Sequence, residues 1–245
     1  MKEIILGAIP GSVFVYRYAS RFELTKIIGL FLMELAPYLL VCYFQDISKI
    51  YALIGFITIY SIYEFGYIDN DLFAVNNEST GKTVRYQFKK FKIKYFLITR
   101  IFTTMIFLYI LFDYINSYEI LILLILLLLI FAIHNRIVNI RYRVITFLVL
   151  NNIKIIIRLL IISSASFIYF LSFMPHIFTK MLHYLFTKEL ALVNEDNFNK
   201  IKISIYIGFL FSIIFIDFKL AIVMSPLLLN HNKKYILNFF IKRHH

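Results

Sequence analysis

The sequence contains no tryptophan, one cysteine, four prolines and seven glycines in 245 residues. The single cysteine, Cys42, cannot form a disulfide within the chain. Because proline and glycine interrupt helices, their scarcity favours long helices over the short alternating strands of a β-barrel. The motifs HExxH, CxxC, GxxxxGKS/T and GxSxG are missing too, so we expect no haem or zinc site.

Apolar residues make up 61% of the chain, and its mean hydropathy is +0.79. A soluble domain is usually about 45–50% apolar, so contact with lipid is the simplest explanation of the excess. The net charge is +12, with 26 Lys and Arg against 14 Asp and Glu. In a membrane protein this excess is typical of basic cytoplasmic loops near lipid headgroups. We therefore expect membrane lipids as partners and no nucleic acid.

Several apolar stretches are candidates for helices that cross a hydrocarbon core of ~30 Å, which needs about 20 residues. They are Ile27–Phe44, Ile50–Gly66, Tyr95–Phe112, Ile120–His134, Val144–Met174, Ile203–Ile216 and Leu220–Leu229. The fifth is long for one span, so we expect Asn151, Asn152 and Lys154 to form an outer hairpin, with one tilted helix as the alternative. The prediction is an all-α membrane bundle of about seven to nine transmembrane helices, forming a single domain over residues 1–245.

Basic residues are concentrated in two of the connections between these stretches. Residues 67–94 contain Lys82 and Arg85 followed by four lysines, and residues 134–143 contain three arginines. The positive-inside rule places both connections, and with them the N-terminus, in the cytoplasm. We expect a multi-pass protein of a bacterial inner or plasma membrane.

A few charged residues lie inside the apolar stretches. Arg100 is near the end of its stretch, so we expect it to snorkel towards the headgroups, whereas Glu34 is deeper and is a candidate for a functional cavity. Lys154 and Arg158 are four residues apart and share one helix face. They either reach an anionic group inside the bundle or snorkel.

Residues 63–85, YEFGYIDNDLFAVNNESTGKTVR, form a polar segment at the predicted cytoplasmic end of the second stretch. Carboxylates and amides come first, and their oxygens are ligands for Mg²⁺, which bridges a protein to substrate phosphates. The basic residues that follow are suited to binding phosphate oxygens. This order predicts a magnesium and diphosphate site, with an ordinary solvated loop as the alternative. The candidates are Asn70, Asp71 and Glu78 for the metal, with Glu64 either joining them or orienting the loop, and Lys82 and Arg85 for the phosphates.

The order Asn70-Asp71, Glu78, Lys82 and Arg85 resembles the first Asp-rich motif of the UbiA superfamily of intramembrane prenyltransferases. That motif is commonly written NDxxDxxxD and lies between the second and third helices, as it does here. Ala74 stands at the position of its middle carboxylate.

Two further segments bear on the resemblance. The second Asp-rich motif of the family corresponds to residues 175–200, which contain Glu195 and Asp196 but no DxxxD. The segment HNRIVNIRYR, residues 134–143, resembles the start of the fifth helix of the family. It suggests Arg141 and Tyr142, with Arg136 and Arg143, as residues that bind the diphosphate.

The resemblance implies a membrane transferase with its active site facing the cytoplasm. The substrate would be a polyprenyl diphosphate that loses diphosphate with the help of Mg²⁺, its prenyl group passing to an acceptor. Asp71 and Glu78 would be the catalytic residues. One alternative is phosphoribosyl transfer from phosphoribosyl diphosphate to a polyprenyl phosphate. Another is a non-enzymatic transporter or an assembly subunit of an envelope pathway.

Overall fold

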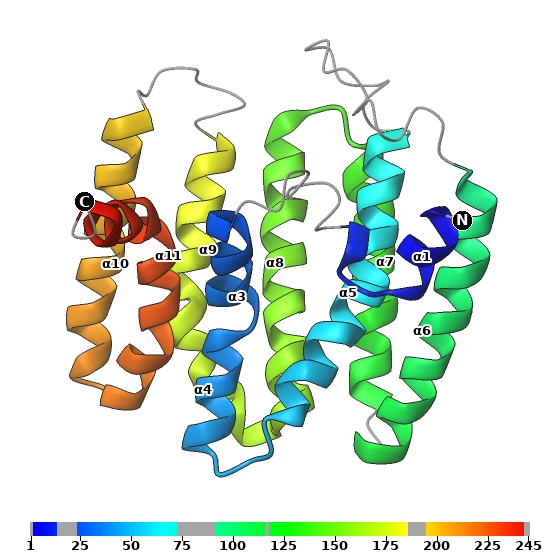
Figure 1. The fold of residues 1–245 in the computed structure, drawn as a ribbon, viewed down its shortest axis with the longest axis horizontal. Helices are drawn as coiled ribbons and strands as arrows, with labels where there is room; N and C mark the ends of the chain where they lie inside the picture. The colour runs from blue at the N-terminus through cyan, green and yellow to red at the C-terminus, as the bar shows by residue number, and fades with distance from the viewer. Residues whose placement is uncertain (1, 14–23, 73–91, 116–117, 186–194, 243–245) are drawn as a thin grey trace. The chain divides into compact units, whose positions relative to one another are not determined.

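The computed structural model describes residues 2–13, 24–72, 92–115, 118–185 and 195–242 (Figure 1). The described residues form helices and no strand, which confirms the all-α prediction. The elements are α1 (Lys2–Ala8), α3 (Leu24–Glu34), α4 (Ala36–Phe44), α5 (Ile50–Leu72), α6 (Ile93–Ile115), α7 (Tyr118–Arg136), α8 (Ile140–Ile162), a 3-10 helix η3 (Ser164–Tyr169), α9 (Phe170–Leu185), α10 (Glu195–Ile214) and α11 (Phe218–Lys242).

Among the described residues, five segments are long and apolar enough to cross a membrane. They are Ile27–Phe44, Ile50–Asp71, Ile93–Ile110, Tyr118–Arg136 and Tyr142–Ile162. At a rise of about 1.5 Å per residue, the 23 residues of α5 extend over roughly 35 Å, enough for a hydrocarbon core. The helices therefore support a membrane-embedded protein that crosses the bilayer several times.

The chain divides into two compact units, residues 1–20 with 54–161 and residues 21–53 with 162–245. The first unit contains α1, α6, α7 and most of α5 and α8. The second contains α3, α4, η3, α9, α10 and α11. The single domain over residues 1–245 stays a prediction.

The hairpin predicted within Val144–Met174 is wrong, because Asn151, Asn152 and Lys154 lie inside the continuous helix α8. The amides of Asn151 and Asn152 each donate to a backbone carbonyl four residues earlier, at 2.8 Å. These bonds satisfy the amides within the helix, so the helix does not have to end there. The chain turns at Ser163 instead, whose hydroxyl accepts from the N–H of Ala165 at the start of η3.

Gly66 on α5 lies directly against Phe131 on α7 in the first unit. A Cβ at Gly66 would overlap the ring of Phe131 on α7. One turn earlier on α5, the Tyr63 ring meets Phe131 edge to face, with 4.5 Å between the centroids. Only glycine leaves room for this aromatic contact.

Gly66→Ala is therefore expected to lower the free energy of unfolding by about 1–3 kcal/mol, because overpacking forces the Phe131 ring or the helices apart. Gly208→Ala is the matched control, since nothing lies within 4 Å of a Cβ built there. Alanine at that helical site is expected to be neutral or to stabilise by up to about 1 kcal/mol. Unfolding of both variants in mixed micelles checks this, and equal stabilities would contradict the packing described.

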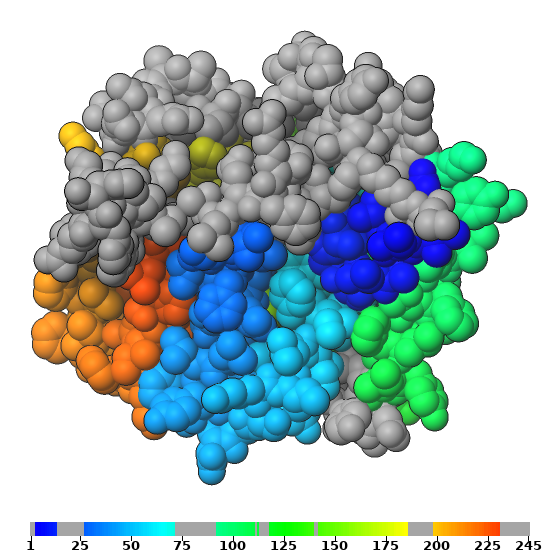
Figure 2. All heavy atoms as spheres, in the orientation of Figure 1, coloured from blue at the N-terminus to red at the C-terminus, as the bar shows by residue number. Residues whose placement is uncertain are grey.

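The second unit is built around α11, which packs against α3, α4, α9 and α10. Figure 2 shows the side chains of α3 and α4 against those of α11. Ser172 on α9 donates to the carbonyl of Leu220 at 2.8 Å, and His176 lies 3.1 Å from the Tyr206 hydroxyl. Glu34 is buried in this unit, close enough for its charge to act on Lys180.

Candidate functional site

The polar pair Asn70-Asp71 lies in the last turn of α5, so the helix continues into the segment that the sequence marks as chemical. Asp71 is only 2% exposed, and the amide of Asn70 donates to its carboxylate at 3.5 Å. Asp side chains are seldom buried, so the burial of Asp71 is unlike the exposure expected of an ordinary solvated loop. Glu78, Lys82 and Arg85 lie outside the described residues.

Arg100 was expected to snorkel, and this prediction is wrong. Its guanidinium is fully buried and lies 2.6 Å from the carboxylate of Glu64, which is fully buried too. Arg100 also donates to the backbone carbonyls of Leu6 and Ile9, the latter at 3.1 Å. A helix leaves its last carbonyls without partners and negatively polarised, so the end of α1 offers acceptors to a cation. Arg100 therefore binds the Glu64 carboxylate and the carbonyls of Leu6 and Ile9 instead of pointing towards the headgroups.

Helix α1 lies close against α6 (Figure 1). Gly7 allows this approach, since a Cβ there would be 2.9 Å from the backbone oxygen of Phe96. Glu3 accepts from the N–H of Lys92 at 3.4 Å, just before α6 begins. Its own backbone N–H, and to a smaller extent that of Lys92, lowers the pKa of the Glu3 carboxyl. The N-terminal helix is thus bound to α6 along its length.

The predicted metal ligands fit a magnesium ion only in part. Asn70 and Asp71 are adjacent oxygen donors, and Mg²⁺ is commonly held by one or two carboxylates together with substrate phosphates. Glu64 does not fit, because Arg100 neutralises it and it lies about 10 Å before Asp71 along α5. In the part of the chain that is described, no three His, Cys, Asp or Glu residues form a group that could hold a metal.

The ends of α5 and α7 meet, which sequence reasoning did not foresee in detail. The amide of Asn135 donates to Asp69 at 2.7 Å and to the Gly66 carbonyl at 3.1 Å. Arg136 lies 3.6 Å from Asp69. The connections 67–94 and 134–143 therefore begin at the same end of the first unit, as the positive-inside rule requires of two loops on one side.

The other basic candidates are distributed around the start of α8. Arg141 lies in its first turn, with its side chain outside the described part, while Tyr142 is 61% exposed and Arg143 is buried. Glu195 and Asp196 lie in the first turn of α10, and their side chains are likewise not described.

Lys154 and Arg158 do not snorkel, because both are buried within the first unit. The ammonium of Lys154 lies 5.3 Å from the ring centroid of Tyr63 and 5.5 Å from that of Tyr60. The guanidinium of Arg158 lies 5.9 Å from the Phe56 ring. One face of α8 thus presents two cations to the aromatic face of α5, an arrangement in which ring faces attract cations.

Cations are prominent among the buried charges of this unit. In its described residues the buried cations are Arg100, Arg143, Lys154 and Arg158, and the buried carboxylates are Glu64 and Asp71. Ionisable groups at membrane depth are expensive, and they mark substrate or ion sites more often than surface charges do. An anionic headgroup would be attracted to this interior.

Comparison of the chain with protein-family models, curated proteins and solved structures gives no match.

Proposed function

We propose that the protein is a UbiA-like membrane transferase that acts on a polyprenyl substrate and releases diphosphate. The observation that carries the proposal is the buried carboxylate of Asp71, beside Asn70, at the end of an apolar helix. The buried cations of α8 support it, because they belong to the same compact unit. Such a unit suits a substrate with an apolar chain and an anionic head.

Each candidate residue has a role in this proposal. Asn70 and Asp71, with Glu78, hold Mg²⁺, which when bound neutralises the charge that develops on the leaving diphosphate. Basic side chains bind the phosphate oxygens. These are Lys82, Arg85 and Arg141, with Tyr142 donating its hydroxyl.

Of the two roles that the sequence allows for Glu64, we propose the orienting one. Its carboxylate holds Arg100, which in turn holds the end of α1. We therefore assign Glu64 to positioning α5 against α6 and α1, so that the last turn of α5 presents Asp71.

The reaction breaks the bond between the first prenyl carbon and the diphosphate oxygen. The diphosphate leaves with the bonding electrons, and the nucleophilic atom of the acceptor forms a bond to the same carbon. The proton of the acceptor passes to a diphosphate oxygen. No strong general base is needed, since the leaving group is already an anion.

The test is to incubate the purified full chain with radiolabelled polyprenyl diphosphate and a membrane extract that supplies acceptors. A labelled lipid product is expected with Mg²⁺, its loss with EDTA, and its return when Mg²⁺ is added in excess. A second arm uses labelled phosphoribosyl diphosphate with polyprenyl phosphate, the other donor and acceptor pair that the resemblance implies. Product in that arm alone would identify phosphoribosyl diphosphate, and not a polyprenyl diphosphate, as the donor.

A non-enzymatic role predicts a different result in the same assay. A carrier or assembly subunit would retain labelled lipid without converting it, and EDTA would have no effect on product because none forms. That outcome in both arms would contradict the transferase.

A further inference from the structure

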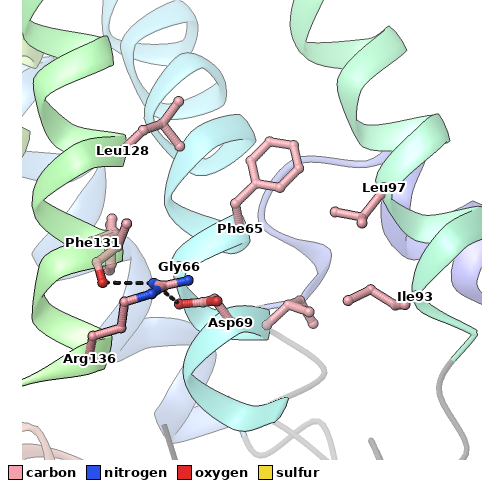
Figure 3. A pocket seen from close by; sticks show the side chains of 10 residues that line it. Phe65, Gly66, Asp69, Ile93, Leu97, Leu128, Phe131 and Arg136 are labelled. Carbon is pink, nitrogen blue, oxygen red and sulfur yellow. Dashed lines mark hydrogen bonds and ion pairs between the residues drawn. The ribbon is translucent and has the colours of Figure 1, made fainter. Parts of the chain in front are cut away.

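A pocket of about 290 Å³ lies between α5, α6 and α7 in the first unit. Its walls are mainly apolar side chains from all three helices (Figure 3). Among them are Phe65, Ile93, Leu97, Leu128 and Phe131. Asp69 and Arg136 supply the charged groups of its lining. The proposed transfer chemistry uses neither of these two residues.

The polar and apolar parts of the pocket are separated along α7. Arg136 is the last residue of a segment that can span the membrane, which puts its guanidinium at the level of the headgroups. Leu128 is eight residues earlier, about 12 Å deeper along the helix axis. Neighbouring side chains such as Ile101 on α6 and Leu129 on α7 are more than half exposed. A bilayer would thus lie beside the pocket, with hydrocarbon against its apolar walls and headgroups near Arg136.

The charges at the rim have opposite signs and remain accessible. Arg136 is 67% exposed and Asp69 is 28% exposed, and the two lie 3.6 Å apart. Arg136 is held in place by a bond to the Ala132 carbonyl at 2.8 Å, and Asp69 by the amide of Asn135. An exposed pair at this separation contributes little to stability, so a ligand can bind both partners at small cost.

We propose that this pocket binds a phosphatidylethanolamine molecule of the surrounding bilayer. Its phosphate accepts hydrogen bonds from Arg136, its ammonium donates to Asp69, and one of its chains lies along Phe131 and Leu128. A purely anionic headgroup such as phosphatidylglycerol places no cation against Asp69. Phosphatidylcholine carries a cation without any N–H to donate. The rim therefore matches the ethanolamine headgroup in both charge and hydrogen bonding.

The test uses the full chain, reconstituted with equal amounts of phosphatidylethanolamine, phosphatidylglycerol and phosphatidylcholine and then extracted in mild detergent. Native mass spectrometry measures which lipid stays bound. Retention of phosphatidylethanolamine is expected to be about threefold above each of the others, the size of one exposed charge contact. Equal retention of the three lipids would overturn the proposal.

Two variants at the rim test the contact of the ammonium and the contact of the phosphate one at a time. Asp69→Asn is expected to remove the preference for phosphatidylethanolamine over phosphatidylglycerol, and Arg136→Gln to lower retention of every phospholipid. An unchanged lipid preference in Asp69→Asn would refute the assignment of the ammonium.

A matched pair of variants tests the pocket itself. Ala132→Phe fills it, since Ala132 is one of its lining residues, whereas Ile133 is exposed and does not line it. Loss of lipid in Ala132→Phe but not in Ile133→Phe is expected. Equal retention in the two would place the lipid elsewhere. A soluble arm with glycerophosphoethanolamine is expected to show no binding, and binding of that headgroup alone would overturn the role of the hydrocarbon chain.

Discussion

Replacing Asp71 with asparagine lowers transfer by more than about a hundredfold if the carboxylate binds the metal, since loss of even an outer partner of a bound metal often costs 10–100-fold. The side chain keeps its size, so its buried place at the end of α5 is preserved. The variant should enter the membrane and elute from size exclusion like the parent chain. Turnover is measured at saturating Mg²⁺ with equal amounts of folded protein.

Asp217→Asn is the control for this substitution. Asp217 is exposed between α10 and α11, and its side chain accepts from the N–H of Lys219, a bond that asparagine can also accept. This variant is expected to keep full turnover. Undiminished turnover in Asp71→Asn would remove Asp71 from the mechanism, and with it the observation that carries the proposed function.

Arg100→Met is expected to lower the free energy of unfolding by about 3–5 kcal/mol. The reason is that the carboxyl group of Glu64 would be left in a fully buried site without the guanidinium that now lies 2.6 Å away. The carbonyls of Leu6 and Ile9 would lose a donor as well. Unfolding in mixed micelles, or the yield of monodisperse protein, measures the loss.

The double variant Glu64→Leu with Arg100→Met measures how much of the stability lost in Arg100→Met comes from leaving Glu64 without its partner. Replacing both members of a buried ion pair by apolar residues is often close to neutral, so most of the lost stability should return. Some loss should persist, because methionine cannot donate to the end of α1. We also expect the folded fraction to retain part of its turnover, because in our proposal Glu64 acts through the position of α5 and not as a metal ligand. Inactive but stable protein would restore Glu64 to the metal site.

Hydropathy alone located the first four apolar stretches well. Ile27–Phe44 coincides with the observed segment, and the next three differ from theirs only at the ends. This success has a physical cause, because a backbone in hydrocarbon must bond to itself and the helix does so within one segment. The same reasoning failed inside Val144–Met174, where Asn151 and Asn152 suggested a hairpin but bond to carbonyls of their own helix.

Contacts between distant residues were beyond the sequence. Glu64 and Arg100 are both visible as charges within apolar stretches, but nothing in their spacing shows that they meet. The side of the membrane on which helices end was easier to predict from the sequence. The charge of the loops predicted that α5 and α7 end on the same side, and Asp69 and Asn135 form a hydrogen bond there. For Glu78, Lys82 and Arg85 the roles rest on the motif alone.

The bond between Arg100 and the end of α1 has a consequence for the order of assembly during synthesis. The ribosome makes α1 before α5 and α6, yet the guanidinium that holds it follows more than 90 residues later. An arginine inside a membrane-spanning segment is costly to insert, and α5 has already supplied the carboxylate that offsets this cost. We expect α5 and α6 to enter the bilayer as a hairpin, with α1 docking last although it is translated before them.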